Sequence, residues 1–417
     1  MLGLVKKAIL TAVLIALSPN SGAAETVTDS AVSKKACLTC HEGIERISEF
    51  HPFDCTVCHE GDPDGKKLEA AHKGLVASPG SYPEAERICG RCHEDIFYRV
   101  QRSPMKTLQA TINKTRFSLM LRKKGDDAVY GYEPPASFPN LKPFVPGSRV
   151  ESKMEKNCLS ACHQGVEGPK IYGGYHKPGC SACHYLTDND GLYKGGDAAL
   201  PGDKPGYGRL HRLTTAIPFT QCNHCHNRYS RDLMNMEVHL REDIGPSFDA
   251  KRKKTAGDHY LPLDPLAPCE KILDCIDCHT HREIMGYGTW IPDKKERLEV
   301  ECVTCHGTPE SPPRSTILRK NDKSLKFIMV NPNLRNRVKE GDRVVLTERG
   351  NILYNVGVTE YNGYSAEGGY KLLGKVHNKV YRLPVIIGSS CGADASETRP
   401  EHCYVCHDVS DEQGGGS

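Results

Sequence analysis

The residues with the clearest chemistry in this chain are its cysteines and the histidines that follow them. Eight copies of Cys-x-x-Cys-His and one copy of Cys-x-x-x-Cys-His use eighteen of the twenty cysteines. Each motif can bring two thiols and an imidazole to one edge and one face of a planar group. In chain order they are motif 1 (Cys37, Cys40, His41), motif 2 (Cys55, Cys58, His59), motif 3 (Cys89, Cys92, His93), motif 4 (Cys158, Cys162, His163), motif 5 (Cys180, Cys183, His184), motif 6 (Cys222, Cys225, His226), motif 7 (Cys275, Cys278, His279), motif 8 (Cys302, Cys305, His306) and motif 9 (Cys403, Cys406, His407).

This pattern predicts nine covalently attached c-type haems. In such a site the two thiols bond to the vinyl groups of one haem, and the adjacent histidine becomes the proximal iron ligand. Zinc ribbons and redox dithiols also use Cys-x-x-Cys, but neither requires histidine at the next position every time. Motif 4 has one extra residue in its loop, and the interpretation as a haem site extends to it.

The remaining histidines are numerous enough to complete the iron coordination. Of nineteen histidines, nine belong to the motifs and ten are left for the nine irons. Seven of these are predicted to be distal ligands: His51, His72, His176, His211, His239, His259 and His377. The other three are His224, inside the loop of motif 6, His281, two residues after a proximal ligand, and His402, next to Cys403; each could serve a neighbouring haem or a neighbouring subunit.

The start of the chain predicts export. Residues 1–24 contain a basic pair, Lys6 and Lys7, then an apolar stretch of about ten residues that is too short to span a bilayer, and a small-residue cleavage site at Gly22-Ala23-Ala24. A secretory signal agrees with the motifs and predicts a periplasmic or extracellular protein without a membrane span. The last residues, 413–417, are interpreted as a flexible tail or a cloning scar.

Composition and charge bear on the core and on the partners. Hydrophobic residues make up 38% of the chain and aromatic residues 7%, which predicts a thin side-chain core that haems would supplement. The formal net charge is +3, and nothing in the chain indicates nucleic-acid binding. The dense basic run at 251–254 is interpreted as a solvated loop near haem propionates, with a docking patch for an acidic partner as the alternative.

Motif spacing divides the chain into segments. We expect a three-haem segment (25–105), a haem-free crossing (106–157), a five-haem segment (158–306), a small antiparallel β-domain (307–395) and a ninth-haem segment (396–412). A helix is predicted from Glu94 to Lys124, followed by a proline-rich extended stretch, and close haem pairs are expected for motifs 1 and 2, 4 and 5, and 7 and 8. The predicted fold class is a mostly irregular and α-helical multihaem cytochrome c fold with little regular secondary structure and a haem-stacked core.

The β-domain is predicted from strand-like runs separated by turn residues. These runs are 325–330, 343–347, 352–359, 370–376 and 379–387. His377 within it is expected to ligate an iron, or else to be merely exposed. The two spare cysteines, Cys269 and Cys391, are interpreted as a disulfide, with free thiols or a contact between subunits as alternatives.

With these motifs and their surroundings, the chain resembles the large multihaem c-type cytochromes of metal- and sulfur-respiring bacteria. The resemblance rests on segments such as 37–43, 51–59, 71–75, 216–227 and 275–280, and it covers about residues 36–310 and 375–408. It implies haems in van der Waals contact, in stacked and T-shaped pairs. It also implies partners such as other cytochromes or redox proteins and extracellular metal or mineral acceptors, and in some members self-association into filaments.

Two functions follow from the ligand count. Bis-histidine, low-spin irons suit an electron-transfer conduit, whereas a catalytic haem needs an open coordination position. Multihaem nitrite reductases mark such a haem with Cys-x-x-Cys-Lys, and this chain has no such motif. We therefore expect a conduit, with a filament subunit as a variant of it. The alternative is an oxidoreductase of a small nitrogen or sulfur compound, with motif 4 as the first candidate for a five-coordinate haem.

Overall fold

The computed structural model describes residues 37–121, 128–135, 141–159, 164–170, 175–226, 239–240, 260–261, 272–289, 297–358 and 369–388. Several predictions from the sequence lie outside these residues. They concern the signal peptide, all of motif 9, Cys162 and His163 of motif 4, the spare cysteines Cys269 and Cys391, the basic run at 251–254, and the histidines His259 and His402. His239 begins strand β3 (His239–Leu240), which pairs with β4 (Tyr260–Leu261) in antiparallel fashion.

The motifs lie on or beside very short helices. Six of the seven motifs that are described in full form or overlap α1 (Cys37–Cys40), α2 (Cys55–His59), α10 (Ser181–His184), α11 (Phe219–His226), α12 (Cys275–Cys278) and α14 (Cys302–His306). Motif 3 follows α4 (Glu84–Ile88). A single helical turn suits the spacing, because residues i and i+3 are neighbours on one helix face and the two sulfurs therefore point the same way.

The helix predicted from Glu94 to Lys124 is wrong as one element. The chain instead forms α5 (Glu94–Val100), α6 (Pro104–Thr107) and α7 (Gln109–Ser118). Pro104 cannot continue a preceding helix but is well placed at the start of a new one, and Ser103 Oγ caps it by accepting from the Lys106 N–H. Leu108 then adopts a left-handed conformation with φ of 49°, which separates α6 from α7.

The haem-free crossing forms a small unit of its own. Its β1 (Tyr130–Gly131) pairs in parallel with β2 (Lys142–Pro143), so part of the proline-rich stretch is extended as expected. The helix α8 (Arg149–Met154) continues into a π-helical turn, η1 (Glu155–Leu159), that contains Cys158 of motif 4. The unit encloses a cluster of Ile112, Phe144, Met154 and Leu159.

The C-terminal part of the described chain contains a five-stranded antiparallel sheet. Its strands are β5 (Ser315–Ile317), β6 (Arg343–Leu346), β7 (Ile352–Val358), β8 (Tyr370–Leu373) and β9 (Val380–Leu383), paired in sequence order. The strand expected at 325–330 is wrong, because this run forms α15 (Ser324–Val330). Leu325 and Ile328 are three residues apart and pack on the sheet, whereas Met329 is exposed, which is a helical rather than an alternating pattern.

Both faces of the sheet are packed, and motif 8 belongs to one of them. One cluster joins Leu318, Ile328, Leu334, Val338, Val344 and Leu373 beneath α15. The other joins Val345, Leu353, Val356, Tyr370, Leu372 and Leu383 to Cys305 of α14. Among the described motif cysteines, Cys305 is the one classed as buried. The sheet is therefore a direct support for motif 8.

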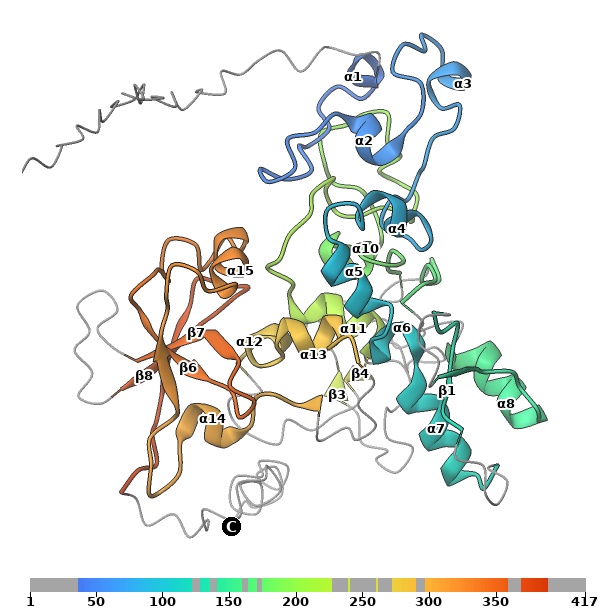
Figure 1. Ribbon diagram of the computed structural model, residues 1–417. Helices are drawn as coiled ribbons and strands as arrows, with labels where there is room; N and C mark the ends of the chain where they lie inside the picture. The colour runs from blue at the N-terminus through green and yellow to red at the C-terminus, as the bar shows by residue number, and fades with distance from the viewer. Residues whose placement is uncertain are drawn as a thin grey trace, which may run out of the picture.

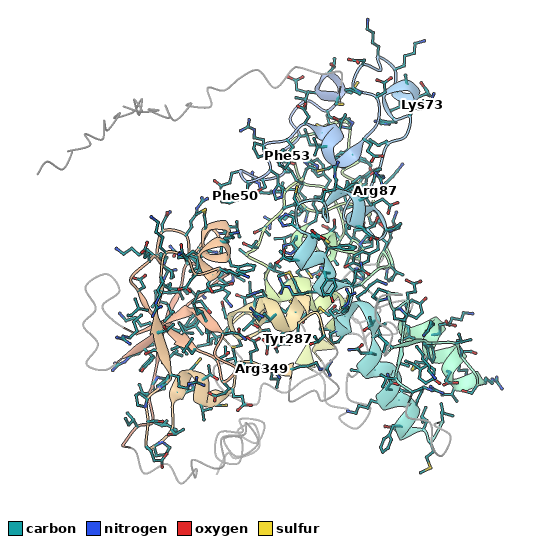
Figure 2. The ribbon with its side chains drawn as sticks, viewed as in Figure 1. Phe50, Phe53, Lys73, Arg87, Tyr287 and Arg349 are labelled. Carbon is teal, nitrogen blue, oxygen red and sulfur yellow. The ribbon has the colours of Figure 1, made fainter. Side chains whose placement is uncertain are left out.

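The remaining elements place the sheet beside the motif helices. Figure 1 shows α1, α2 and the short α3 (Leu68–Ala71) at one end, α4, α5 and α10 below them, and α11, α12 and α13 (His281–Met285) leading to the sheet. At that junction the Arg349 guanidinium lies 5.1 Å from the centre of the Tyr287 ring (Figure 2). No helix within the described ranges is long and apolar enough to cross a membrane.

The sheet core gives a prediction for stability. Leu353→Ala should lower the free energy of unfolding by about 2–5 kcal/mol, because it leaves a cavity beside Val345 and Cys305. Val380→Ala, at a half-exposed position in β9, should have little effect. Calorimetric unfolding of both variants would test this, and equal losses of stability would contradict the described core.

Candidate haem-binding sites

Three motif histidines each face a histidine from outside the motifs. The ring centres are 6.2 Å apart for His41 and His72, 6.1 Å for His93 and His51, and 5.9 Å for His59 and His211. Two imidazoles that bind one metal ion from opposite sides, with metal–nitrogen distances of about 2 Å, have ring centres about 6 Å apart. The spacing in motifs 1, 2 and 3 therefore fits bis-histidine coordination of an iron between each pair of rings.

Hydrogen bonds orient several of these rings. The Nδ1 atoms of His59, His184 and His306 lie 2.9, 2.8 and 2.7 Å from the carbonyl oxygens of Val76, Thr214 and Pro384. Metal-binding histidines commonly donate one ring N–H to an oxygen in this way, which fixes the tautomer and leaves the other nitrogen for the metal. In these three motifs the arrangement leaves Nε2 as the available ligand atom.

In motif 1 the histidine ring faces a side-chain carboxylate instead of a backbone carbonyl oxygen. His41 Nδ1 lies 2.6 Å from Oδ2 of Asp197, a carboxylate whose side chain is fully buried. The other carboxylate oxygen accepts the Ala199 N–H at 2.9 Å. Gly43 permits this approach, because a Cβ there would lie 2.5 Å from the Gly196 carbonyl oxygen.

Glu45 joins the loop at 188–213 to motifs 1 and 2. Its carboxylate accepts hydrogen bonds from the Gly196 N–H, the His211 N–H and the Tyr193 hydroxyl, at 2.9, 3.0 and 2.9 Å. Its carbonyl oxygen is 2.9 Å from His211 Nδ1. Burial alone would raise the pKa of Glu45, but these hydrogen bonds outweigh burial and lower it. One residue thus positions both the distal candidate of motif 2 and the segment that carries Asp197.

Successive motifs lie next to one another along the described chain. A hydrogen bond between the thiols of Cys89 and Cys180 lowers the pKa of Cys89 and raises that of Cys180, which places motif 3 against motif 5. The Cys222 thiol donates a hydrogen bond to Cys275, and this bond, together with burial, raises the pKa of Cys222, which places motif 6 against motif 7. The pairing of motif 3 with motif 5, and of motif 6 with motif 7, was not among the close pairs predicted from the spacing of the motifs in the sequence.

Further contacts complete the run from motif 1 to motif 7. Burial lowers the pKa of His59, and the nearby His211 and His41 rings lower it further, which places motif 1 near motif 2. Burial and then the Cys89 thiol raise the pKa of Cys58. Helix α10 contacts α11, and α11 contacts α12. These contacts give the spatial order of motifs 1, 2, 3, 5, 6 and 7.

Lys375 connects motif 7 to motif 8. Its backbone N–H donates to Asp277 Oδ1 at 2.7 Å, and its ammonium group donates to the Ile276 carbonyl oxygen at 2.5 Å. Burial lowers its pKa, and this shift is opposed by Asp277 and by Cys278 and Cys305 of the two motifs. A cation from the β-domain therefore lies close to both attachment loops, which agrees with the expected proximity of motifs 7 and 8.

The other described histidines differ in their surroundings. His176 is buried, and its Nδ1 is 3.1 Å from the Lys177 carbonyl oxygen. The His281 ring stacks on Phe327 at 4.1 Å, and burial lowers its pKa to about 3, so that the imidazole is neutral. His377 is about half exposed, with Nε2 3.5 Å from Asp274 Oδ2, and no described motif histidine is seen opposite it.

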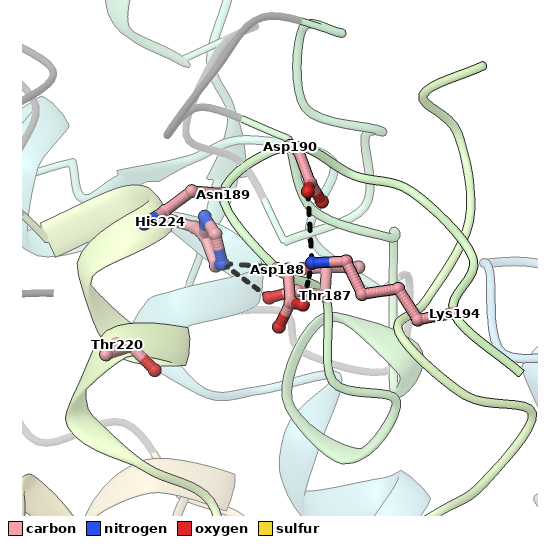
Figure 3. Close-up of a pocket in the computed structure, with 7 residues that line it drawn as sticks. All are labelled: Thr187, Asp188, Asn189, Asp190, Lys194, Thr220 and His224. Carbon is pink, nitrogen blue, oxygen red and sulfur yellow. Dashed lines mark hydrogen bonds and ion pairs between the residues drawn. The ribbon is translucent and has the colours of Figure 1, made fainter. Parts of the chain in front are cut away.

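His224 borders a polar hollow of about 290 Å³ that is also lined by Thr187, Asp188, Asn189, Asp190, Lys194 and Thr220 (Figure 3). The His224 Nε2 atom is 3.2 Å from the Thr187 carbonyl oxygen and 3.4 Å from its hydroxyl. Lys194 pairs with Asp188 and Asp190 at 2.5 and 3.0 Å. The hollow thus lacks the apolar lining that a haem or an organic ligand requires, and its charges are already paired.

Exposed apolar side chains gather around motifs 1 and 2. Phe50 and Phe53 extend from the loop between these motifs (Figure 2), and Val57, Leu68 and Leu75 are also exposed. Such side chains would be shielded from water by haems attached to the neighbouring cysteines. Together with the ring pairs, this exposure fits haem attachment at motifs 1 to 3, whereas the buried Cys305 fits it less well at motif 8.

Sequence reasoning did not find Glu45 or Asp197. Neither belongs to a motif, and Asp197 is 156 residues from His41 in the chain. The motif histidines and three of their partners were all among the predicted ligands. No family model, curated protein or solved structure matches this chain.

The pairing predicts the effect of removing one distal ligand. His211→Ala should leave the haem content unchanged and convert about one-ninth of the iron from low spin to high spin, because the iron of motif 2 loses a ligand. Absorption and electron paramagnetic resonance (EPR) spectra of the oxidised protein would measure this. His224→Asn is the control and should leave all spin states as in the wild type; a high-spin signal in the control alone would reverse the assignment.

Proposed function

We propose that this chain is a nonahaem c-type cytochrome that conducts electrons through a series of closely spaced bis-histidine haems. The observation that carries the proposal is the set of three ring pairs at about 6 Å, in which one ring follows a Cys-x-x-Cys segment and the other comes from outside the motifs. Iron ligated on both sides exchanges electrons without binding a substrate. The chain's own residues would hold and orient the haems, exclude water and set the potentials.

The order of the motifs in space supports conduction over long range. Motifs 1, 2, 3, 5, 6 and 7 lie near one another in this order, with an Arg91–Val57 hydrogen bond between motifs 2 and 3, and Lys375 links motifs 7 and 8. Neighbouring attachment loops would hold the edges of their haems near one another, which favours short distances for electron transfer between them. Partners on this proposal are other redox proteins or extracellular metal or mineral acceptors, after export from the cytoplasm.

The proposal predicts the haem content and the response to carbon monoxide. The purified protein should contain nine haems per chain by the pyridine haemochrome assay. The fully reduced protein should bind no carbon monoxide, since each iron has two strong ligands. Absence of haem would refute the proposal. Carbon monoxide binding by one haem would instead support the oxidoreductase alternative, with motif 4 examined first.

Self-association is tested separately. In the filament variant of the proposal, a spare histidine completes a haem of the next subunit. Electron microscopy of the purified protein should then show filaments, with haems continuous from one subunit to the next. Discrete monomers under all conditions would contradict the filament variant and leave the conduit intact.

A further inference from the structure

The oxygen atoms that accept from the motif histidines fall into two classes. For His59, His184 and His306 the acceptor is a neutral backbone carbonyl. For His41 it is the carboxylate of Asp197 at 2.6 Å. The His279 Nδ1 atom has a carboxylate neighbour as well, Glu283, but their separation of 3.7 Å is beyond hydrogen-bond distance. Glu283 also accepts from the Thr280 and Glu299 N–H groups. Motif 1 therefore has a short, charged hydrogen bond that these other motifs lack.

We propose that Asp197 is a positioning residue that gives the haem of motif 1 the lowest reduction potential among the haems of motifs 1, 2, 5, 7 and 8. This inference rests on the proposed function. An imidazole that donates its N–H to a carboxylate gains negative character and becomes a stronger electron donor to the metal, which stabilises ferric over ferrous iron. The nearby negative charge acts in the same direction.

Burial makes the effect of the carboxylate large. The Asp197 side chain is fully buried, so that solvent and salt screen its charge poorly. The Oδ1 atom of Asp197 accepts a hydrogen bond from the Ala199 N–H. The backbone N–H of Asp197 donates to the Tyr193 hydroxyl at 3.1 Å. The carboxylate is thus fixed in direction as well as in distance, and it cannot swing away from the imidazole without breaking these bonds.

A purely structural role for Asp197 is the competing explanation. The loop around it is already anchored by Glu45, through the Gly196 N–H, the His211 N–H and the Tyr193 hydroxyl. Asparagine has the same shape but only one acceptor oxygen, so it can accept from the Ala199 N–H or from the His41 ring but not from both, and it carries no charge. Replacement by asparagine therefore removes the charge beside His41, while the Glu45 hydrogen bonds that anchor the loop remain.

The position of motif 1 gives the inference a functional meaning. In the spatial order of the described motifs, motif 1 stands at one end, and Figure 1 shows its helix α1 far from α12 and the sheet. The next motif, with a carbonyl acceptor on His59, lies beside it. A low potential at motif 1 would therefore give the series of haems a direction, with motif 1 at its reducing end.

The test is an optically monitored redox titration of the whole holoprotein, wild type and Asp197→Asn. In the variant, about one-ninth of the haem absorbance change should move to higher potential. We expect at least a tenfold change in the ferrous-to-ferric ratio at fixed potential, which is about 59 mV for one electron. The control is Asp203→Asn, an exposed carboxylate in the same loop, which should shift the curve far less.

The outcomes separate this inference from the proposed function. Nine haems per chain with an unshifted titration in Asp197→Asn would overturn the role of Asp197 and leave the cytochrome proposal standing. A wild-type protein without haem would refute the cytochrome proposal itself. An equal shift in Asp203→Asn would also overturn the inference, since the loss of any negative charge in the loop would then explain the shift in potential without a specific role for Asp197.

A second measurement covers the case in which Asp197→Asn fails to retain its haem. EPR spectra of the wild-type protein, recorded during the titration, should contain one low-spin species with the low maximum g value typical of an imidazole with anionic character. That species should be among the last to be reduced. If no such species is present, or if it is reduced early, the inference is wrong.

Discussion

Carboxylates that accept backbone hydrogen bonds hold together segments of this protein that are far apart in the sequence. Glu45 binds Gly196 and His211, which are 151 and 166 residues away. Asp277, on the helix of motif 7, binds the backbone of Lys375 in the β-domain, 98 residues away. Together with the His41–Asp197 bond and the bond from the Lys375 ammonium group to Ile276, these bonds hold the loop at 188–213 against motifs 1 and 2 and the sheet against motif 7. The proposed haem series depends on both junctions.

The β-domain contacts motifs 7 and 8 directly, although it is a separate stretch of the sequence. Cys305 lies in the core of the sheet, His306 Nδ1 is held by the Pro384 carbonyl oxygen, and Lys375 reaches the backbone of motif 7. A chain with 38% hydrophobic residues has limited means to build rigid supports from side chains alone. The sheet provides one rigid support, and attached haems would supply the apolar contact area that the N-terminal segment lacks.

The parts of the structure that could be predicted are those encoded locally. Most of the strands of the sheet follow from the alternation of apolar residues and from the turn residues between them. The predicted strand at 325–330 failed because a largely apolar run of six residues fits a helix as well as a strand when only its composition is read. The helix predicted from Glu94 failed because Pro104 and the left-handed Leu108 divide it.

Contacts between distant segments could not be predicted in the same way. Nothing in the sequence near Asp197 indicates that it meets His41, and the pairing of His59 with His211 spans most of the N-terminal half of the chain. The count of ten spare histidines indicated that ligands were available, but not which iron each would serve. These assignments require the fold, because they depend on Glu45 and on the close approach that Gly43 permits.

The most direct test of the central claim is an experimental structure of the haem-loaded protein by electron cryomicroscopy. The account predicts an iron between His41 and His72, between His59 and His211, and between His93 and His51. It also predicts that the haems of motifs 1, 2, 3, 5, 6, 7 and 8 form one series in which each porphyrin touches the next. An iron with any other ligand pair in motifs 1 to 3, or a break in the series wide enough to hold a layer of protein, would contradict it.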